Sequence, residues 1–146
     1  MAEDNILTLM VAHHALLDAL FALFRDQIKD GAPNAKSSVA ELRWETRKHF
    51  FVEENAIFDF VTMESYGVLS TINQLKDEHV TMLNDLKTFL EKFPAIKSDE
   101  LENFHSLLES HRKLEEENLY PKLDKELSQD QKKEIVKRIN EIPLTK

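Results

Sequence analysis

The sequence predicts an all-α protein, an up-down-up-down four-helix bundle with a short fifth helix near its C-terminal end. Apolar residues recur at spacings of three and four along four long segments, which is the period of a helix with one buried face. The chain has only two glycines and four prolines, too few turn residues for a barrel or sandwich. Short connections between the segments make neighbouring helices antiparallel. A chain of 146 residues suits one domain over 1–146, with the bundle at about 6–123 and a C-terminal extension over 124–146.

The first two helices are delimited by turn residues. The first is expected from about Ile6 to Ile28, and the turn Gly31–Asn34 ends it because Gly and Pro stop helices. The second is expected from about Ser38 to Glu64, and the turn Ser65–Gly67 breaks it. Both segments are long enough to form one side of a bundle.

The remaining helices are placed by prolines and serines. The third begins near residue 70 and stops before Pro94, because a residue that precedes proline disfavours the helical conformation. The fourth begins near Ser98, which we expect to cap it, and Pro121 marks its end or a kink. The short fifth helix begins at Ser128, which is followed three residues later by a glutamine, as in a capping box.

Composition narrows the classes of function. With 27 acidic and 19 basic residues the chain carries a net charge of −8, which argues against nucleic acid and anionic membranes as partners. Without cysteine it has no disulfide, iron–sulfur cluster or thiol nucleophile. Its first residues lack the basic region of a signal peptide, and its most apolar stretch, Ala15–Phe24, is too short to span a bilayer. We therefore expect a cytoplasmic protein.

The predicted helices form an internal repeat that places histidines and glutamates at equivalent positions. Each repeat is a helical hairpin with one histidine on its first helix and His-x3-Glu-Glu on its second. With six histidines and 17 glutamates, chance gives about 0.08 copies of His-x3-Glu-Glu, yet the chain has two. The residues are His14, His49, Glu53 and Glu54 in the first repeat and His79, His111, Glu115 and Glu116 in the second.

The two His-x3-Glu pairs predict a metal site. Residues four apart share a helix face, so His49 lies beside Glu53 and His111 beside Glu115, each pair within an apolar stripe. Burying carboxylates that face each other is costly unless positive charge lies between them. No Lys or Arg occupies the inferred core positions. A pair of divalent metal ions would supply that charge.

With these motifs the chain resembles the hemerythrin-like (HHE cation-binding) proteins, over roughly residues 6–123. The resemblance implies a non-haem centre of two irons, joined by a bridging oxo or hydroxo group, in which two carboxylates bridge the metals and imidazoles complete each side. The matching motifs are His14 with Leu17 and Phe21, His49-x3-Glu53, Glu78-His79 with Leu86, and His111-x3-Glu115 running into Leu119-Tyr120-Pro121. The implied metal ligands are His14, His49, Glu53, His79, His111 and Glu115.

Several assignments around this centre stay open. The family's apolar pattern behind its first histidine fits His14 better than the neighbouring His13, without deciding between them. We expect His105 to be structural or exposed, because it lies about 120° from His111 around its helix. The glutamates next to the ligands either accept hydrogen bonds from imidazole N–H groups or lie on solvated helix surface. These glutamates are Glu54, Glu78 and Glu116.

One position departs from the family pattern. The oxygen carriers of the family have a second histidine on the third helix, four residues after the first, and here that position is Leu83. The resemblance then implies four histidines and two glutamates, with an open or water-filled position on each iron. A substitute ligand could come from any one of four residues. They are Glu54, Glu116, Tyr66 and Tyr120.

We therefore expect a di-iron protein that binds O₂ or a related small molecule, in oxygen or redox binding or sensing. The alternatives are a di-iron enzyme that handles peroxide or nitric oxide, iron storage or buffering, and a structural bundle without metal. Histidine and carboxylate ligands suit iron, which we favour over manganese and zinc. No catalytic residue and no cofactor other than metal is assigned. The expected partner is a small diatomic or peroxide ligand, and a sensor would also need a separate protein partner.

Overall fold

The computed structural model describes residues 5–64 and 67–141, and in these ranges it contains helices and no strand. The all-α prediction is confirmed. Two of the helical segments, η1 and η2, are turns of π-helix. The elements are α1 (Ile6–Lys29), α2 (Ala35–Val52), η1 (Glu53–Phe58), α3 (Asp59–Glu64), α4 (Leu69–Lys92), α5 (Ser98–Leu114), η2 (Glu115–Leu119), α6 (Tyr120–Glu126) and α7 (Gln129–Glu141).

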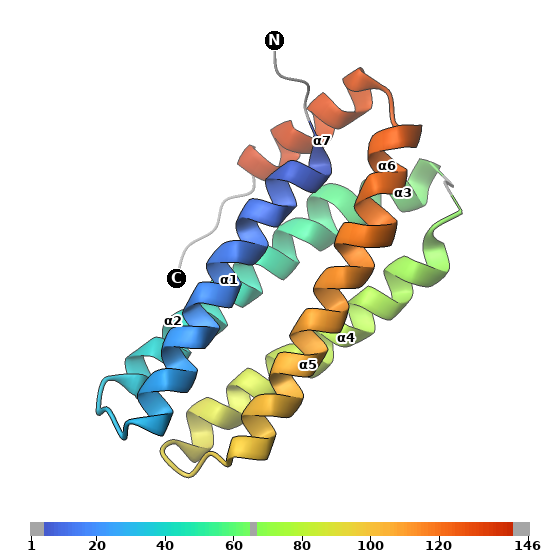
Figure 1. The fold of residues 1–146 in the computed structure, drawn as a ribbon. Coiled ribbons are helices and arrows are strands. Elements are labelled where there is room, and N and C mark those ends of the chain that lie inside the picture. Colours follow the sequence, from blue (N-terminus) through green and yellow to red (C-terminus); the bar gives the residue numbers. More distant parts are fainter. Residues whose placement is uncertain (1–4, 65–66, 142–146) are drawn as a thin grey trace.

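The elements combine into four long rods. The rods are α1, the continuous run α2–η1–α3, α4, and the continuous run α5–η2–α6, with α7 lying across one end (Figure 1). α1 packs on α2, α2 on α4 and α4 on α5, and contacts between α1 and α6 close the ring. The α1–α2 and α4–α5 connections lie at the same end of the bundle, so the chain runs up, down, up and down (Figure 1).

Two π-helical turns interrupt the second and fourth rods at equivalent places in the repeat. Each begins at the glutamate of a His-x3-Glu pair, Glu53 or Glu115. The backbone N–H of Asp59 donates to the Glu54 carbonyl, and that of Tyr120 donates to the Glu115 carbonyl, which is the i→i+5 pattern of a π turn. The sequence pattern did not predict these turns, which in other proteins are frequent at functional sites.

Helix boundaries follow the turn residues with two corrections. The second rod begins at Ala35 rather than near Ser38. Ser98 is the first residue of α5 and not its cap, because the Glu100 side chain accepts from the Lys97 backbone N–H at 3.0 Å one residue earlier. α4 ends before Pro94 as expected.

Three further boundaries were predicted, at Pro121, at Ser128 and at Ser65–Gly67. The fourth rod continues through Pro121 to Glu126, with the π turn immediately before the proline. The Ser128 capping box is confirmed, since its hydroxyl accepts from the Gln131 N–H at 3.1 Å and its own N–H donates to the Gln131 side chain at 2.9 Å. The break predicted at Ser65–Gly67 lies largely outside the described residues, although Gly67 has the left-handed φ of +71° that suits a turn.

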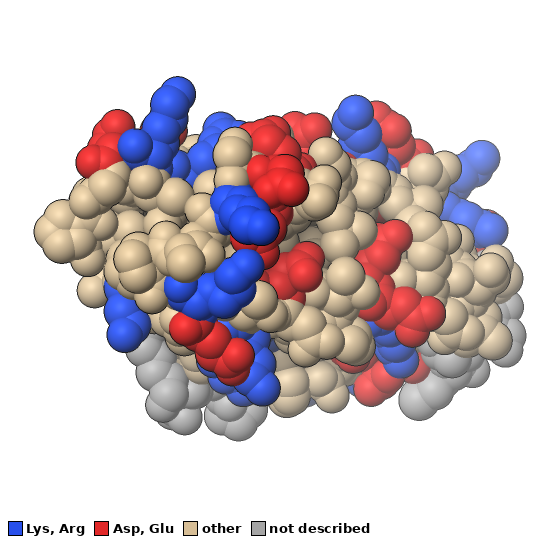
Figure 2. Space-filling view, turned by 90° about the horizontal axis from the view of Figure 1, so that it is seen from below, with Lys and Arg blue, Asp and Glu red and all other residues tan. Residues whose placement is uncertain are grey.

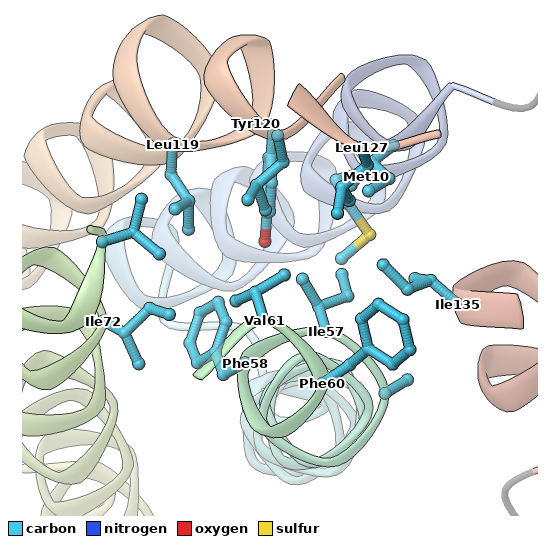
Figure 3. Close-up of a cluster of buried hydrophobic side chains, with 14 of the residues drawn as sticks. Met10, Ile57, Phe58, Phe60, Val61, Ile72, Leu119, Tyr120, Leu127 and Ile135 are labelled. Atoms are coloured by element: carbon cyan, nitrogen blue, oxygen red, sulfur yellow. The ribbon is translucent and has the colours of Figure 1, made fainter. Parts of the chain in front are cut away.

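The core consists of two apolar clusters on either side of a polar layer. The cluster near α7 includes Tyr120, Ile57, Phe58 and Ile135 among its buried side chains (Figure 3). The cluster nearer the connections is built around phenylalanines of three rods, Phe21, Phe24, Phe89 and Phe104. The four repeat histidines, with Glu53 and Glu115, form this polar layer and are themselves buried.

α1 extends well beyond the apolar stretch Ala15–Phe24 at both ends. By length and composition alone it is the one described helix able to cross a membrane, a test that the core helix of a bundle also passes. In the structure α1 is one rod of the bundle. It buries His14 in the polar layer, and its Asp18 binds Arg112 of α5.

Acidic and basic side chains alternate on the face seen in Figure 2. Lys92 Nζ lies 2.7 Å from a Glu100 carboxylate oxygen, and Arg25 lies 3.9 Å from Glu102. On this face the basic side chains do not form the continuous surface that nucleic acid requires.

Candidate metal centre

Four histidines and two glutamates from all four rods meet in the polar layer. Glu53 and Glu115 are 0% exposed, and the four histidines are between 1% and 5% exposed. Their side-chain atoms form two four-residue groups in which the potential ligand atoms all lie within 4.8 Å of one another. Both glutamates belong to both groups. The groups are His14, His49, Glu53 and Glu115, and Glu53, His79, His111 and Glu115.

Each of these six side chains has a buried polar atom without a hydrogen-bond partner among the described residues. The atoms are Nε2 of each histidine and Oε1 of each glutamate. His14 Nε2 lies 3.0 Å from Glu115 Oε1, and His79 Nε2 lies 3.0 Å from Glu53 Oε1. Each unsatisfied buried polar group costs about 1–3 kcal/mol, so six in one place call for a bound group. Imidazole nitrogen and carboxylate oxygen are ligands that iron, manganese and zinc accept, so the residues fit a pair of metal ions.

The outward nitrogens of three of the histidines are held by glutamates. A carboxylate that accepts from Nδ1–H leaves the Nε2 lone pair directed inward, toward the centre. This arrangement decides between the two roles considered for these glutamates in favour of hydrogen bonding. The pairs are His14 Nδ1 with Glu116 at 2.5 Å, His79 Nδ1 with Glu54 at 2.7 Å, and His111 Nδ1 with Glu78 at 2.8 Å.

Tyr120 closes the centre on the side of α7. Its side chain is 0% exposed and its hydroxyl points into the interior of the bundle (Figure 3). The hydroxyl donates to Glu53 Oε2 and lies 3.2 Å from Glu115 Oε2. In a regular α-helix Tyr120 would lie about 140° around the axis from Glu115, so the wide η2 turn is what brings the two to the same side.

The other candidates for the ligand missing at Leu83 are placed differently. Glu54 and Glu116 bind outward imidazole nitrogens, and Tyr66 lies outside the described residues. Tyr120 is the one described candidate that contacts both shared carboxylates. Leu83 itself is partly buried and packs against the phenylalanine cluster.

In the metal-free protein, burial and the charges of neighbouring groups determine which of the Glu53 and Glu115 carboxyl groups is ionised. Burial raises the pKa of Glu115 well above the ordinary range, and the negative charge of Glu53 raises it further. Burial also opposes ionisation of Glu53, but the nearby side chains of His49, Glu115 and His79 lower its pKa well below the ordinary range. The metal-free pair therefore carries its negative charge on Glu53 and its proton on Glu115.

The pKa values of two histidines of the centre are also shifted in opposite directions. Burial, together with the charge of His79, lowers the pKa of His111 to about 4. For His79 burial acts against protonation, but the nearby Glu53 carboxylate and the hydrogen bond to Glu54 raise its pKa overall. Metal binding must therefore displace protons from the centre, because metal ions bind neutral imidazole and ionised carboxylate.

Two phenylalanines fix the plane of the His79 ring. Phe50 stacks on it with centroids 3.8 Å apart and planes 11° apart, and Phe58 lies on it at 5.9 Å and 12°. Phe58 occupies the place in the first repeat that Tyr120 occupies in the second. Among the residues described, the phenolic hydroxyl against the carboxylates therefore comes from the second repeat.

Two histidines lie outside the centre. His14, and not His13, faces the carboxylates, while His13 lies at the edge with its ring centroid 5.6 Å from that of His49. His105 stacks on Phe21 at 5.5 Å and contacts Glu109 at 3.4 Å, which agrees with a structural role.

Comparison with known protein families matches residues 5–123 to the hemerythrin HHE cation binding domain. The chain belongs to the hemerythrin HHE cation-binding family. The match covers the four rods up to Leu123, and so includes all six residues of the centre and Tyr120. Searches of curated proteins and of solved structures gave no significant match to this hemerythrin-like chain. The family supports cation binding, and the buried histidine and glutamate cluster is where the cation would bind.

Proposed function

We propose that this hemerythrin-like protein holds two irons and binds O₂ or a related small molecule, in oxygen or redox sensing. The observation that carries the proposal is the sharing of Glu53 and Glu115 by two groups of potential ligand atoms. His14 and His49 would hold one iron, and His79 and His111 the other. Bound iron would supply reversible redox chemistry and an open coordination position for a small ligand.

The residues around the centre favour a small ligand. The space beside His14 and His111, between α1 and α5, measures about 10 Å³, roughly what one water needs. The ion pair of Asp18 with Arg112 lies at this space. The stacked ring of Phe50 and the cluster beyond it exclude water on the side of the connections. A diatomic molecule suits such a site better than a polar organic substrate.

Tyr120 and the outer glutamates, which are Glu54, Glu78 and Glu116, have distinct roles in this proposal. The glutamates hold the proton of each imidazole at Nδ1 and so keep Nε2 free for metal. Tyr120 holds a proton at its hydroxyl, directed at Glu53 Oε2, and burial and the two carboxylates raise its pKa well above that of a free tyrosine. It can therefore stabilise charge on the shared carboxylates without losing its own proton at neutral pH.

An enzyme that handles peroxide or nitric oxide is the second candidate, and Leu83 is the observation that favours it. With no histidine at this position, the iron held by His79 and His111 would have one protein ligand fewer than in the family's oxygen carriers. Iron storage is less well supported, because the six inward-facing ligand atoms suit two metal ions and not a larger number.

The distinguishing experiment starts from protein loaded anaerobically with iron. The reduced protein is exposed to air, the oxygen is then removed, and the visible spectrum is recorded at each step. A spectral change that reverses supports binding or sensing. Irreversible oxidation with turnover of added peroxide or nitric oxide would replace this proposal by the enzyme.

We also propose that the protein acts in the cytoplasm, on small ligands rather than on nucleic acid or membranes. The net charge of −8 and the alternating charges on the surface support this proposal (Figure 2). Cell fractionation with an antibody against the chain tests it, and recovery in the membrane fraction would contradict it.

A further inference from the structure

The internal repeat makes the surroundings of the four histidines comparable. The glutamate that follows each shared glutamate binds the first-helix histidine of the other repeat. In the second repeat Glu78, which precedes His79, binds His111 Nδ1 at 2.8 Å. The equivalent residue in the first repeat, which precedes His14, is His13. The repeat therefore places a histidine where the fourth carboxylate would be.

His49 is accordingly the one histidine of the centre whose outward nitrogen has no partner among the described residues. Its side chain is 4% exposed, and its Nδ1 is buried without a hydrogen bond. Its Nε2 is turned toward Glu53 at 3.6 Å, so the ring edge that carries Nδ1 is turned away from the centre. A buried donor without an acceptor is costly, so an acceptor is expected from outside the chain.

A cavity of about 190 Å³ lies beside His49, between α1 and α2. His49 forms part of its wall together with His13, Glu45 and Lys48. Leu16 and Val52 are among the apolar side chains that line the rest. An apolar cavity of about 150 Å³ accommodates benzene, so this one has room for a molecule of six or so non-hydrogen atoms.

We propose that this cavity binds a short monocarboxylate, whose carboxylate accepts from His49 Nδ1–H. Each of the four histidines of the centre would then have a carboxylate at its outward nitrogen. Lys48 supplies the positive charge, and the apolar wall accommodates a short alkyl chain. The inference rests on the function proposed above, because metal on Nε2 is what fixes a proton on Nδ1. Glu45 is not that acceptor in this structure. Its carboxylate lies 3.4 Å from Lys48 Nζ, and His49 Nδ1 has no hydrogen-bond partner among the described residues.

The experiment is equilibrium dialysis of radiolabelled butyrate against the iron-loaded protein, with iron counted in the same samples. One butyrate per chain is expected, with much weaker competition from butyramide, which has no charge. His13→Glu supplies the missing carboxylate and is expected to weaken butyrate binding at least tenfold while two irons remain. Glu45→Gln removes a competing negative charge and is expected to strengthen binding.

A pair of tryptophan variants controls for indirect effects. Leu16 lines the cavity and is 49% exposed, so Leu16→Trp fills the space without a fold penalty and is expected to weaken binding at least tenfold. Leu23 lies two turns further along α1 and is 48% exposed, so Leu23→Trp is expected to change nothing.

Each remaining outcome overturns the proposal in a distinguishable way. Two irons without bound butyrate overturn this inference alone. Butyrate that binds the His13→Glu and Leu16→Trp variants as tightly as the original protein would be a ligand of the irons and not of the cavity. A protein that takes up no iron overturns the proposed function together with this inference.

Discussion

Replacing the two shared carboxylates by amides separates metal binding from folding. Glu53 and Glu115 belong to both ligand groups, so either Glu→Gln substitution is expected to lower the iron content from two per chain to none. The metal-free variants should differ in stability. Glu115 carries the proton of the pair, so neutral glutamine is a close substitute there. Glu53 is ionised and accepts from the Tyr120 hydroxyl, so glutamine removes a charged hydrogen bond.

The magnitudes follow from the contacts. A hydrogen bond to a buried charged group contributes about 1.5–3 kcal/mol, so metal-free Glu53→Gln should melt roughly 5–10 °C below the original protein. Metal-free Glu115→Gln should melt within about 2 °C of it. Free metal at 100 times its Kd stabilises by about 2.7 kcal/mol per site, so loading the original protein should raise Tm by roughly 10–20 °C. Neither variant should show this rise.

The assay is thermal unfolding followed by circular dichroism, with and without iron, on samples whose metal content is measured. A Glu115→Gln variant that keeps one iron would show that the carboxylate is not shared. Equal destabilisation of the two metal-free variants would refute the assignment of the charge to Glu53.

Three further predictions concern single residues. Tyr120→Phe should lower the unfolding free energy of the metal-free protein by about 1.5–3 kcal/mol and leave two irons bound, and an unchanged stability would contradict the hydrogen bond to Glu53. Since the pKa of His111 is lowered to about 4, the unfolded chain gains a proton below pH 6.5 that the folded chain does not, so this residue costs stability as pH falls toward 4. Between pH 7 and 5 the unfolding free energy of metal-free His111→Asn should therefore rise by about 2 kcal/mol relative to that of the original metal-free protein, as measured by urea unfolding. A difference that stays constant with pH would contradict a neutral His111 imidazole. Leu83→His adds an imidazole one turn after His79 and should slow iron release to a chelator at least tenfold, whereas equal release would show that position 83 does not face the metal.

The helices and the six central residues could be predicted because both follow from helical periodicity. His49 and Glu53, like His111 and Glu115, are one turn apart within apolar stripes, and burial of those stripes brings them together. The choice of His14 over His13 followed from the same stripe. That these residues bind two irons stays a prediction.

The features that were missed are not recorded in the apolar spacing of the sequence. The π turns at Glu53 and Glu115 add one residue to a helical turn, which apolar spacing does not record. Without η2 the sequence could not place Tyr120 against the carboxylates, so it remained one of four candidates. Ser98 was expected to cap α5 because serine is a common cap, but the Glu100 side chain binds the preceding N–H instead.

The outer glutamates show the same limit. Glu54 and Glu116 are adjacent to central residues of their own helices but bind histidines of the opposite repeat. Which neighbour an outward side chain reaches is set by how the rods cross, and one sequence does not contain this information. For the same reason one sequence does not show that Nδ1 of His49, unlike Nδ1 of the three other histidines, has no hydrogen-bond partner among the described residues.

The most direct test of the central claim is the metal content of protein loaded with iron under anaerobic conditions and freed of excess metal. Two shared carboxylates and four histidines with inward-facing Nε2 atoms predict two irons per chain. Well under one iron per chain, in folded protein, would contradict the account.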